Sequence, residues 1–94
     1  MQIKWLRLAL DDIDEIAEYI AQDNKRAAQK VVSFIYQNVK NLENHPNIGK
    51  AGRVSGTREL YISGTPFIVP YRVIENEIQI LRVLHTSRKW PKEF

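Results

Sequence analysis

The fold is decided by residues 67–85, which read FIVPYRVIENEIQILRVLH. Apolar and β-branched residues fill this stretch on both sides of Glu75-Asn76, a pair typical of a tight turn. The stretch therefore predicts a β-hairpin with strands at 67–74 and 77–85. Pro70 lies inside the first strand and has no N–H for the ladder, so we expect it at an edge-facing position or at a bulge.

The segments before this hairpin complete a predicted sheet. A strand at 58–62 leads into a turn at Gly64-Thr65-Pro66, and both follow a loop at 47–56 that holds three of the four glycines. Residues 1–6 alternate loosely between apolar and polar side chains and predict a short first strand.

Two amphipathic helices are predicted between the first strand and the loop. The acidic run Asp11 to Glu15 opens the first helix, with Asp12 and Glu15 spaced as a capping box. Asn24 caps the second helix, which Asn44-His45-Pro46 ends. Apolar residues recur with helical spacing in both helices: Leu10, Ile13, Ile16, Ala17 and Ile20, then Ala28, Val31, Ile35, Val39 and Leu42. We predict one α+β domain over residues 1–94, in which an antiparallel helical hairpin covers one face of an antiparallel meander.

The composition excludes several classes of protein. The chain has 94 residues, 44% hydrophobic and 27% charged, which is typical of one small globular domain. It has no apolar run near the roughly 18 residues of a membrane span, and no cysteine for a disulfide scaffold, thiol catalysis or a thiolate zinc site. Met1 to Trp5 also lacks the features of a signal peptide, so we expect a cytoplasmic protein. With no cysteine and only two histidines, we expect no metal and no cofactor.

The positive charge is concentrated in the second half of the chain. Residues 1–48 carry six Lys and Arg against seven Asp and Glu, whereas residues 49–94 carry eight against four. This asymmetry is consistent with an anionic partner such as nucleic acid, or with a basic face that only favours solubility.

Three arginines are predicted to lie one on each of the last three strands: Arg58, Arg72 and Arg82. An arginine within an apolar strand is costly to bury unless it is paired, so three of them suggest a shared cationic groove. Pairing with helix carboxylates, or extension of the guanidinium to the rim, is the alternative.

The register of the hairpin decides which cations share a face. A two-residue turn places Arg72 opposite Gln79 and on the face of His85. A three-residue loop places Arg72 opposite Ile80 and on the face of Arg82. A bulge at Pro70 would shift the alternation again.

The C-terminal segment 86–94 mixes cations with Trp90 and Phe94. Cations beside aromatic rings are typical of segments that stack on unpaired bases. The alternative is that Trp90 folds back and packs against the core. His85 is either a general acid or base near neutral pH or a strand-end residue.

Three linked motifs resemble those of the RelE/ParE superfamily, the toxins of type II toxin–antitoxin modules. They are GKAGRVSGTREL (49–60), GTPFIVPYRV (64–73) and ILRVLHTSRKWP (80–91). On this fold, RelE-like members cut mRNA in the ribosomal A site, whereas ParE-like members poison DNA gyrase. The resemblance implies growth inhibition, plasmid stabilisation and a small acidic antitoxin encoded beside the toxin.

From the resemblance we expect the RelE-like activity, a metal-independent mRNA endonuclease that acts on the ribosome, with the ParE-like activity as the alternative. Arg72 and Arg82 would hold the scissile phosphate and His85 would transfer protons. The C-terminal Tyr of many ribosome-dependent members is absent, and Trp90 is nearest to it in kind. The implied substrate-binding residues are Lys50, Arg53, Arg58, Arg88 and Trp90. For the ParE-like activity, the helical hairpin and the tail would contact gyrase without catalysis.

Overall fold

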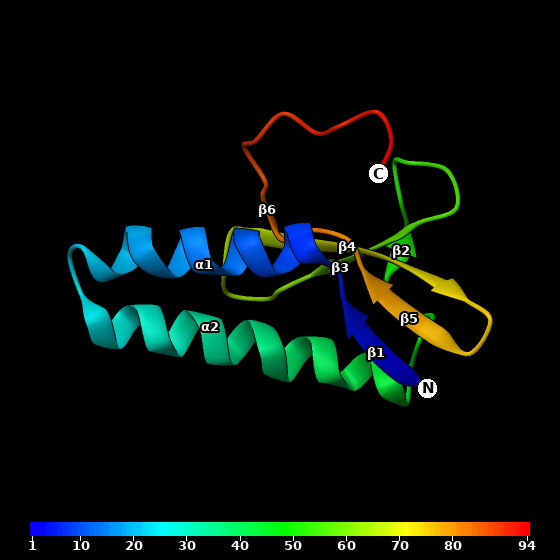
Figure 1. The fold of residues 1–94 in the computed structure, drawn as a ribbon, viewed down its shortest axis with the longest axis horizontal. Coiled ribbons are helices and arrows are strands. Elements are labelled where there is room, and N and C mark those ends of the chain that lie inside the picture. Colours follow the sequence, from blue (N-terminus) through cyan, green and yellow to red (C-terminus); the bar gives the residue numbers. More distant parts are fainter.

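Two helices cover one face of a six-stranded sheet whose main path runs β1-β5-β4-β3-β2, with β6 also paired to β4 (Figure 1). The computed structural model describes residues 1–94. The predicted α+β class and order of elements are confirmed. Neither α-helix combines the length and the hydrophobicity of a transmembrane span. The elements are β1 (Gln2–Trp5), α1 (Arg7–Ala21), α2 (Lys25–Lys40), the 3₁₀ turn η1 (Asn41–Glu43), β2 (Lys50–Ala51), β3 (Arg58–Tyr61), β4 (Phe67–Ile74), β5 (Glu77–Ile80) and β6 (Leu84–His85).

The first strand joins the sheet in parallel with β5, and every other pair is antiparallel. Ile3 lies opposite Ile78 and Trp5 opposite Ile80, so the apolar residues of β1 extend the face that the helices cover. The chain reaches this parallel position through the helical hairpin, which supplies the crossover that a parallel pair requires.

The core lies between the helices and this face of the sheet. Ile35 and Val39 of α2 are buried against Val69, Tyr71 and other apolar residues of the strands. The predicted apolar stripe of α2 is therefore confirmed, and the Asn24 side chain accepts a hydrogen bond from the N–H of Ala27 at 3.0 Å as the predicted cap.

The start of the first helix was predicted incorrectly. α1 begins at Arg7, a full turn before Asp11, and its N-cap residue Leu6 forms no side-chain hydrogen bond. Asp12 is therefore not part of a capping box; it lies in the second turn and is buried. Leu10 is exposed rather than part of the core.

The predicted continuous strand 77–85 is also wrong. β5 ends at Ile80, and β6 begins at Leu84 and pairs with the start of β4 instead. The N–H of Leu81 donates to the carbonyl of Pro70 at 3.0 Å, but Pro70 has no N–H to return a bond on that side. The ladder breaks opposite Pro70, in agreement with the expected bulge.

Asp12 of α1 satisfies the groups that this break frees. Its Oδ2 accepts hydrogen bonds from Arg82 Nε at 2.7 Å and from the N–H of Val83 at 2.9 Å, and its Oδ1 accepts from Arg82 Nη2 at 2.9 Å. The side chains of Asp12 and Arg82 are only 6% and 17% exposed. One carboxylate thus neutralises a largely buried guanidinium and caps an interrupted strand.

Replacement of Asp12 should destabilise the fold strongly. The change Asp12→Ala leaves Arg82 largely buried without its counter-charge, and we expect it to lower the free energy of unfolding by about 3–5 kcal/mol. The matched control is Asp11→Ala, whose exposed carboxylate lies 3.6 Å from Arg7, with an expected change within about 0.5 kcal/mol. Urea denaturation measures both, and equal effects of the two changes would contradict this role of Asp12.

Candidate functional site

The hairpin has the two-residue turn, with Ile74 opposite Glu77 and Arg72 opposite Gln79. This register predicted that His85 shares the face of Arg72, but His85 lies on the opposite face. His85 lies opposite Phe67, which is five residues before Arg72 and packs against the core. Because side chains alternate along a strand, Phe67 and Arg72 point to opposite faces. The break at 81–83 removes the alternation on which the prediction depended.

The three residues predicted to act on a scissile phosphate are divided between the two faces of the sheet. Arg82 is bound to Asp12, and this hydrogen bond raises the pKa of Arg82. His85 is exposed beside α1, and its Nδ1 lies 3.1 Å from the backbone N and 2.7 Å from the Oγ of Ser87. Arg72 lies on the face away from the helices, where its Nε donates to Gln79 Oε1 at 2.8 Å. The structure therefore does not bring Arg72 together with Arg82 and His85.

The loop before β2 is held by two side chains of the sheet. The hydroxyl of Tyr71 donates to the carbonyl of Pro46 at 2.8 Å and accepts from the N–H of Gly49 at 2.9 Å. A Cβ at Gly49 would lie 2.6 Å from the Tyr71 ring, so the close approach requires glycine. Arg58 Nη1 donates to the carbonyls of Gly49 at 2.8 Å and Asn47 at 3.3 Å.

Arg58 and Arg72 line one hollow at the end of the sheet. Its volume is about 280 Å³, and we call it the arginine hollow. The predicted shared groove of three arginines thus forms with two of them. The other residues that line it are Asn47, Ala51, Gly56, Thr57 and Val73.

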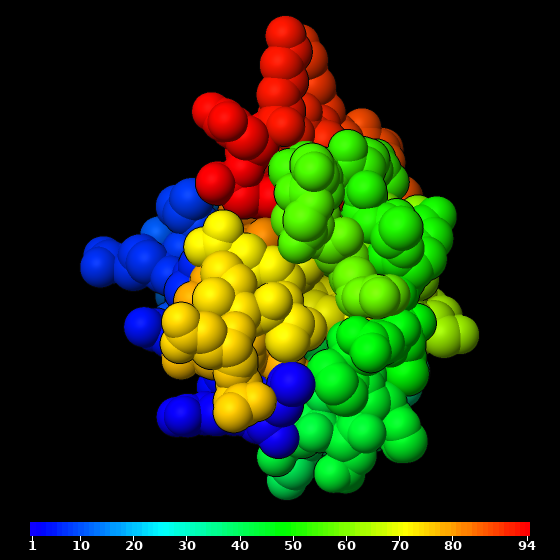
Figure 2. Space-filling model, turned by 90° about the vertical axis from the view of Figure 1, so that its right-hand side faces the viewer, coloured from blue at the N-terminus to red at the C-terminus, as the bar shows by residue number.

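The C-terminal segment folds back onto the loop that precedes β3 (Figures 1 and 2). The Arg53 guanidinium lies 3.7 Å from the centroid of the Trp90 ring, and Phe94 contacts the same ring edge-on. Arg53 is fixed in turn by Glu59, which accepts from its backbone N at 2.8 Å and its Nε at 3.1 Å and raises its pKa. Trp90 is therefore half-buried against Arg53, and its indole N–H is buried without a partner.

The remaining predicted binding residues lie apart from this contact. Lys50 is exposed on β2, with its ammonium 4.3 Å from the centroid of the Tyr61 ring. Arg88 is exposed in the tail, where its backbone N–H donates to the carbonyl of His85 at 3.0 Å. No cluster of three or more His, Asp or Glu side chains could hold a metal ion.

A second surface feature is a groove on the helix side of the molecule. This apolar groove has a volume of about 560 Å³ and runs between α1, α2, the 64–66 turn and β6. Tyr19 on its rim is 76% exposed, and a large exposed aromatic residue on an amphipathic helix was the signal that could have indicated it. Its other apolar and aromatic lining residues are Ile16, Ile20, Val31, Pro66, Phe67 and His85.

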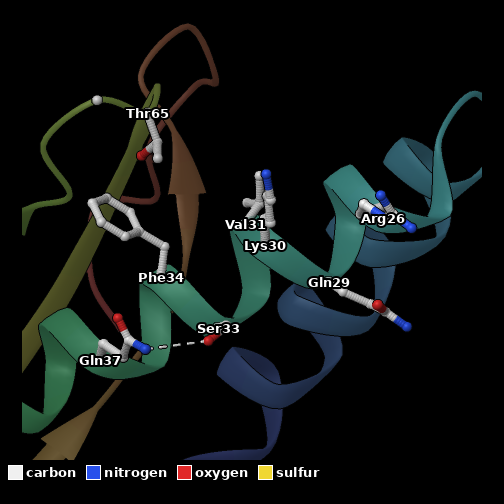
Figure 3. A pocket seen from close by; sticks show the side chains of 9 residues that line it. Arg26, Gln29, Lys30, Val31, Ser33, Phe34, Gln37 and Thr65 are labelled. Carbon is white, nitrogen blue, oxygen red and sulfur yellow. Dashed lines mark hydrogen bonds between the residues drawn. The ribbon is translucent and has the colours of Figure 1, made fainter.

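A basic hollow of about 530 Å³ adjoins the apolar groove and shares Val31, Gly64 and Thr65 with it. Figure 3 shows Arg26 and Lys30 projecting from α2 along this hollow, in which Phe34 points towards Thr65. The two hollows together form an apolar surface with a cationic side.

The family model for the ParE toxin of type II toxin–antitoxin systems (parDE) matches residues 3–90. The chain belongs to this toxin family. A relative from Sinorhizobium fredii, “Putative toxin Y4kP”, is 41% identical, and the match covers 97% of this chain and 94% of that protein. Toxin RelE2 of Caulobacter vibrioides is 29% identical, with 93% and 97% covered.

Solved structures agree with the family. A chain of the chromosomal ParDE toxin–antitoxin system from P. aeruginosa superposes with a TM-score of 0.83 at 36% identity, covering 90% of this chain and 95% of that one. The RelBE2 toxin–antitoxin complex from Mycobacterium tuberculosis gives a TM-score of 0.61 at 25% identity, with 89% and 95% covered. This ParE-family chain thus shares the RelE/ParE fold predicted from its motifs.

The buried phenol of Tyr71 makes the Pro46–Gly49 loop sensitive to alkali. Burial raises the pKa of Tyr71 above its usual value of 10, because the phenolate is less well solvated there. Its contribution to stability is therefore complete below about pH 10 and is lost as the pH rises further. In an absorbance titration of phenolate, we expect Tyr71 to ionise in a late step, and Tyr71→Phe to remove that step. Loss of an early step in Tyr71→Phe would contradict this assignment.

Proposed function

We propose that this chain is the toxin of a type II toxin–antitoxin module and that it inhibits growth by binding DNA gyrase, without catalysis. The observation that carries the proposal is the position of the three predicted catalytic residues. Asp12 neutralises Arg82, and the sheet separates Arg72 from His85. A phosphate held by Arg72 would be out of reach of a proton donor at His85, so the geometry favours action by protein contact.

The match to the ParE toxin family and the higher TM-score with the ParDE system support the same choice. The tail also supports it. One face of the Trp90 ring is already covered by Arg53, so Trp90 is not an open platform for an RNA base.

The second candidate is the ribosome-dependent mRNA endonuclease, which the basic second half of the chain and the similarity to Toxin RelE2 favour. Two assays on the purified chain separate the candidates. We expect inhibition of gyrase supercoiling with accumulation of cleaved DNA, and no cleavage of mRNA in toe-printing of translating ribosomes with or without EDTA. Cleavage of mRNA without an effect on supercoiling would overturn the proposal.

Replacement of His85 tests the absence of catalysis. Without a proton-transfer step, His85→Gln should retain gyrase inhibition and growth inhibition within severalfold, because glutamine preserves a polar side chain at this exposed position. If His85 transferred a proton, activity would fall by orders of magnitude while the fold remained intact. Growth curves after induction measure the effect, with circular dichroism as the check on folding.

A cognate antitoxin, encoded beside the toxin, would bind and inhibit it. The apolar groove and the adjoining basic hollow match an acidic amphipathic helix, with its apolar face towards Val31 and its carboxylates near Arg26 and Lys30 (Figure 3). The solved ParDE and RelBE2 systems support such a partner.

The exposed Tyr19 should be an anchor for this antitoxin. We expect Tyr19→Ala to weaken binding of the co-expressed neighbouring gene product by about tenfold or more, because aromatic side chains in apolar grooves dominate interface energies. The matched control is Leu8→Ala, which removes an apolar side chain of α1 that is 57% exposed and does not line the groove. Calorimetric titration measures both, and equal affinities for the two variants would exclude the groove.

A further inference from the structure

We infer that the arginine hollow is a subsite for the phosphodiester backbone of a nucleic acid. This inference goes beyond the proposed function, because it assigns to the toxin its own contact with nucleic acid, at the end of the sheet where Arg58 of the helix-covered face meets Arg72 of the opposite face. Its evidence is the charge, the orientation and the surroundings of Arg58 and Arg72.

The positive charges in the hollow are not compensated. Three other arginines have a carboxylate within 4 Å: Arg7 pairs with Asp11, Arg53 with Glu59 and Arg82 with Asp12. Arg58 and Arg72 instead donate to neutral oxygens, the carbonyls of Asn47 and Gly49 and the side-chain amide of Gln79. Each therefore keeps its full charge for an external anion.

Both guanidinium groups are also held in position before any ligand binds. Glu77 Oε1 accepts from Gln79 Nε2 at 2.9 Å, which turns the amide oxygen of Gln79 towards Arg72 Nε at 2.8 Å. Arg58 uses Nη1 for the carbonyl of Gly49 at 2.8 Å. No hydrogen bond within the chain uses Nη1 or Nη2 of Arg72, or Nη2 of Arg58. Each guanidinium therefore keeps N–H groups that can donate to phosphate oxygens.

The walls of the hollow suit a phosphate better than an acidic peptide. At about 280 Å³ it is half the size of the apolar groove, and only Ala51 and Val73 contribute apolar side chains. A docked peptide needs apolar pockets for its anchors, and those lie on the helix side. Gly56, at a φ of +79°, presents backbone with open space around it, so a bulky backbone can approach.

Two carboxylates lie nearby, and one of them, Glu77, bonds to Gln79 and forms no ion pair with Arg72. Glu93 lines the adjoining hollow of about 310 Å³, which shares Gly56, Thr57 and Arg72, but it forms no ion pair with Arg72. The negative charge of Glu93 should slightly weaken the binding of an anion at Arg72. Removal of this charge should therefore raise the affinity for a polyanion.

The salt dependence of binding tests the subsite. Fluorescence anisotropy of the purified chain with labelled 20-base-pair DNA, and in a second arm with single-stranded RNA of equal length, gives the affinity from 50 to 200 mM salt. We expect Arg72→Gln to weaken binding roughly tenfold and to reduce the slope of log K against log[salt] by about 0.9 for the duplex or 0.7 for the single strand. Glutamine can still bond to Gln79, which should preserve the fold.

Three further variants complete the test. Arg7→Gln removes the same charge from an exposed position on α1 and should leave the slope unchanged. Arg58→Lys keeps the charge but loses the fork, and should weaken binding severalfold with the slope retained. Glu93→Gln should bind more tightly than the native chain. Binding in only one arm identifies DNA or RNA as the ligand and supports the subsite equally.

The inference is overturned if the native chain binds neither nucleic acid, or if Arg72→Gln and Arg7→Gln have the same slope. It is also overturned if Arg72→Gln weakens only the complex with the acidic antitoxin. Gyrase inhibition by the native chain is measured separately, so failure of the proposed function would not be mistaken for failure of the subsite.

Discussion

The interaction between Asp12 and the 82–83 segment is the constraint on which the rest of the structure depends. Pro70 interrupts the ladder of the central strand, and the chain opposite it must leave the sheet at Leu81. Without a partner from elsewhere, the N–H of Val83 and the charge of Arg82 would be buried unsatisfied. The carboxylate on α1 satisfies both, and so it joins the helical hairpin to the last strand and directs β6 along β4.

This arrangement gives the two sides of the sheet different surfaces. The helix side carries the apolar groove with Tyr19 on its rim and His85 at one end. The other side carries Arg72, and the sheet end holds it beside Arg58, where neutral oxygens fix both without cancelling their charge. The apolar groove on the helix side and the arginine hollow at the end of the sheet are therefore two separate surfaces.

The elements with strong local signals could be predicted from the sequence. The strand 67–74, the cap at Asn24 and the stripe of α2 follow from residue type and periodicity alone. The break at 81–83 could not be predicted, because Leu81 to Val83 read as a strand and only the missing N–H of Pro70 on the neighbouring strand interrupts it. The acidic run at 11–15 resembled a helix start because Asp12 and Glu15 have the spacing of a capping box. Local spacing does not reveal that the partner of Asp12 lies seventy residues away.

The same long-range contact explains why the candidate site was only partly predicted. Of the basic residues in 49–58, Arg58 lines the arginine hollow, whereas Lys50 lies over the Tyr61 ring and Arg53 over the Trp90 ring. The resemblance assigned Arg72, Arg82 and His85 to one site, whereas alternation along a continuous strand predicted only one of Arg82 and His85 on the face of Arg72. The break at 81–83 changes these faces. The partner of Arg82 lies on a helix, which was one of the alternatives for an arginine within an apolar strand.

The central claim is that Arg82 stabilises the fold by its pairing with Asp12 and does not bind a substrate. The most direct test is the double variant Asp12→Asn with Arg82→Gln, which removes both charges and keeps an amide oxygen for the N–H of Val83. Growth inhibition and the urea midpoint are measured together on this variant. The account predicts a folded chain that still inhibits growth, because an ion pair and a neutral pair can serve the same structural role. A chain that folds as stably as the native one but no longer inhibits growth would contradict it.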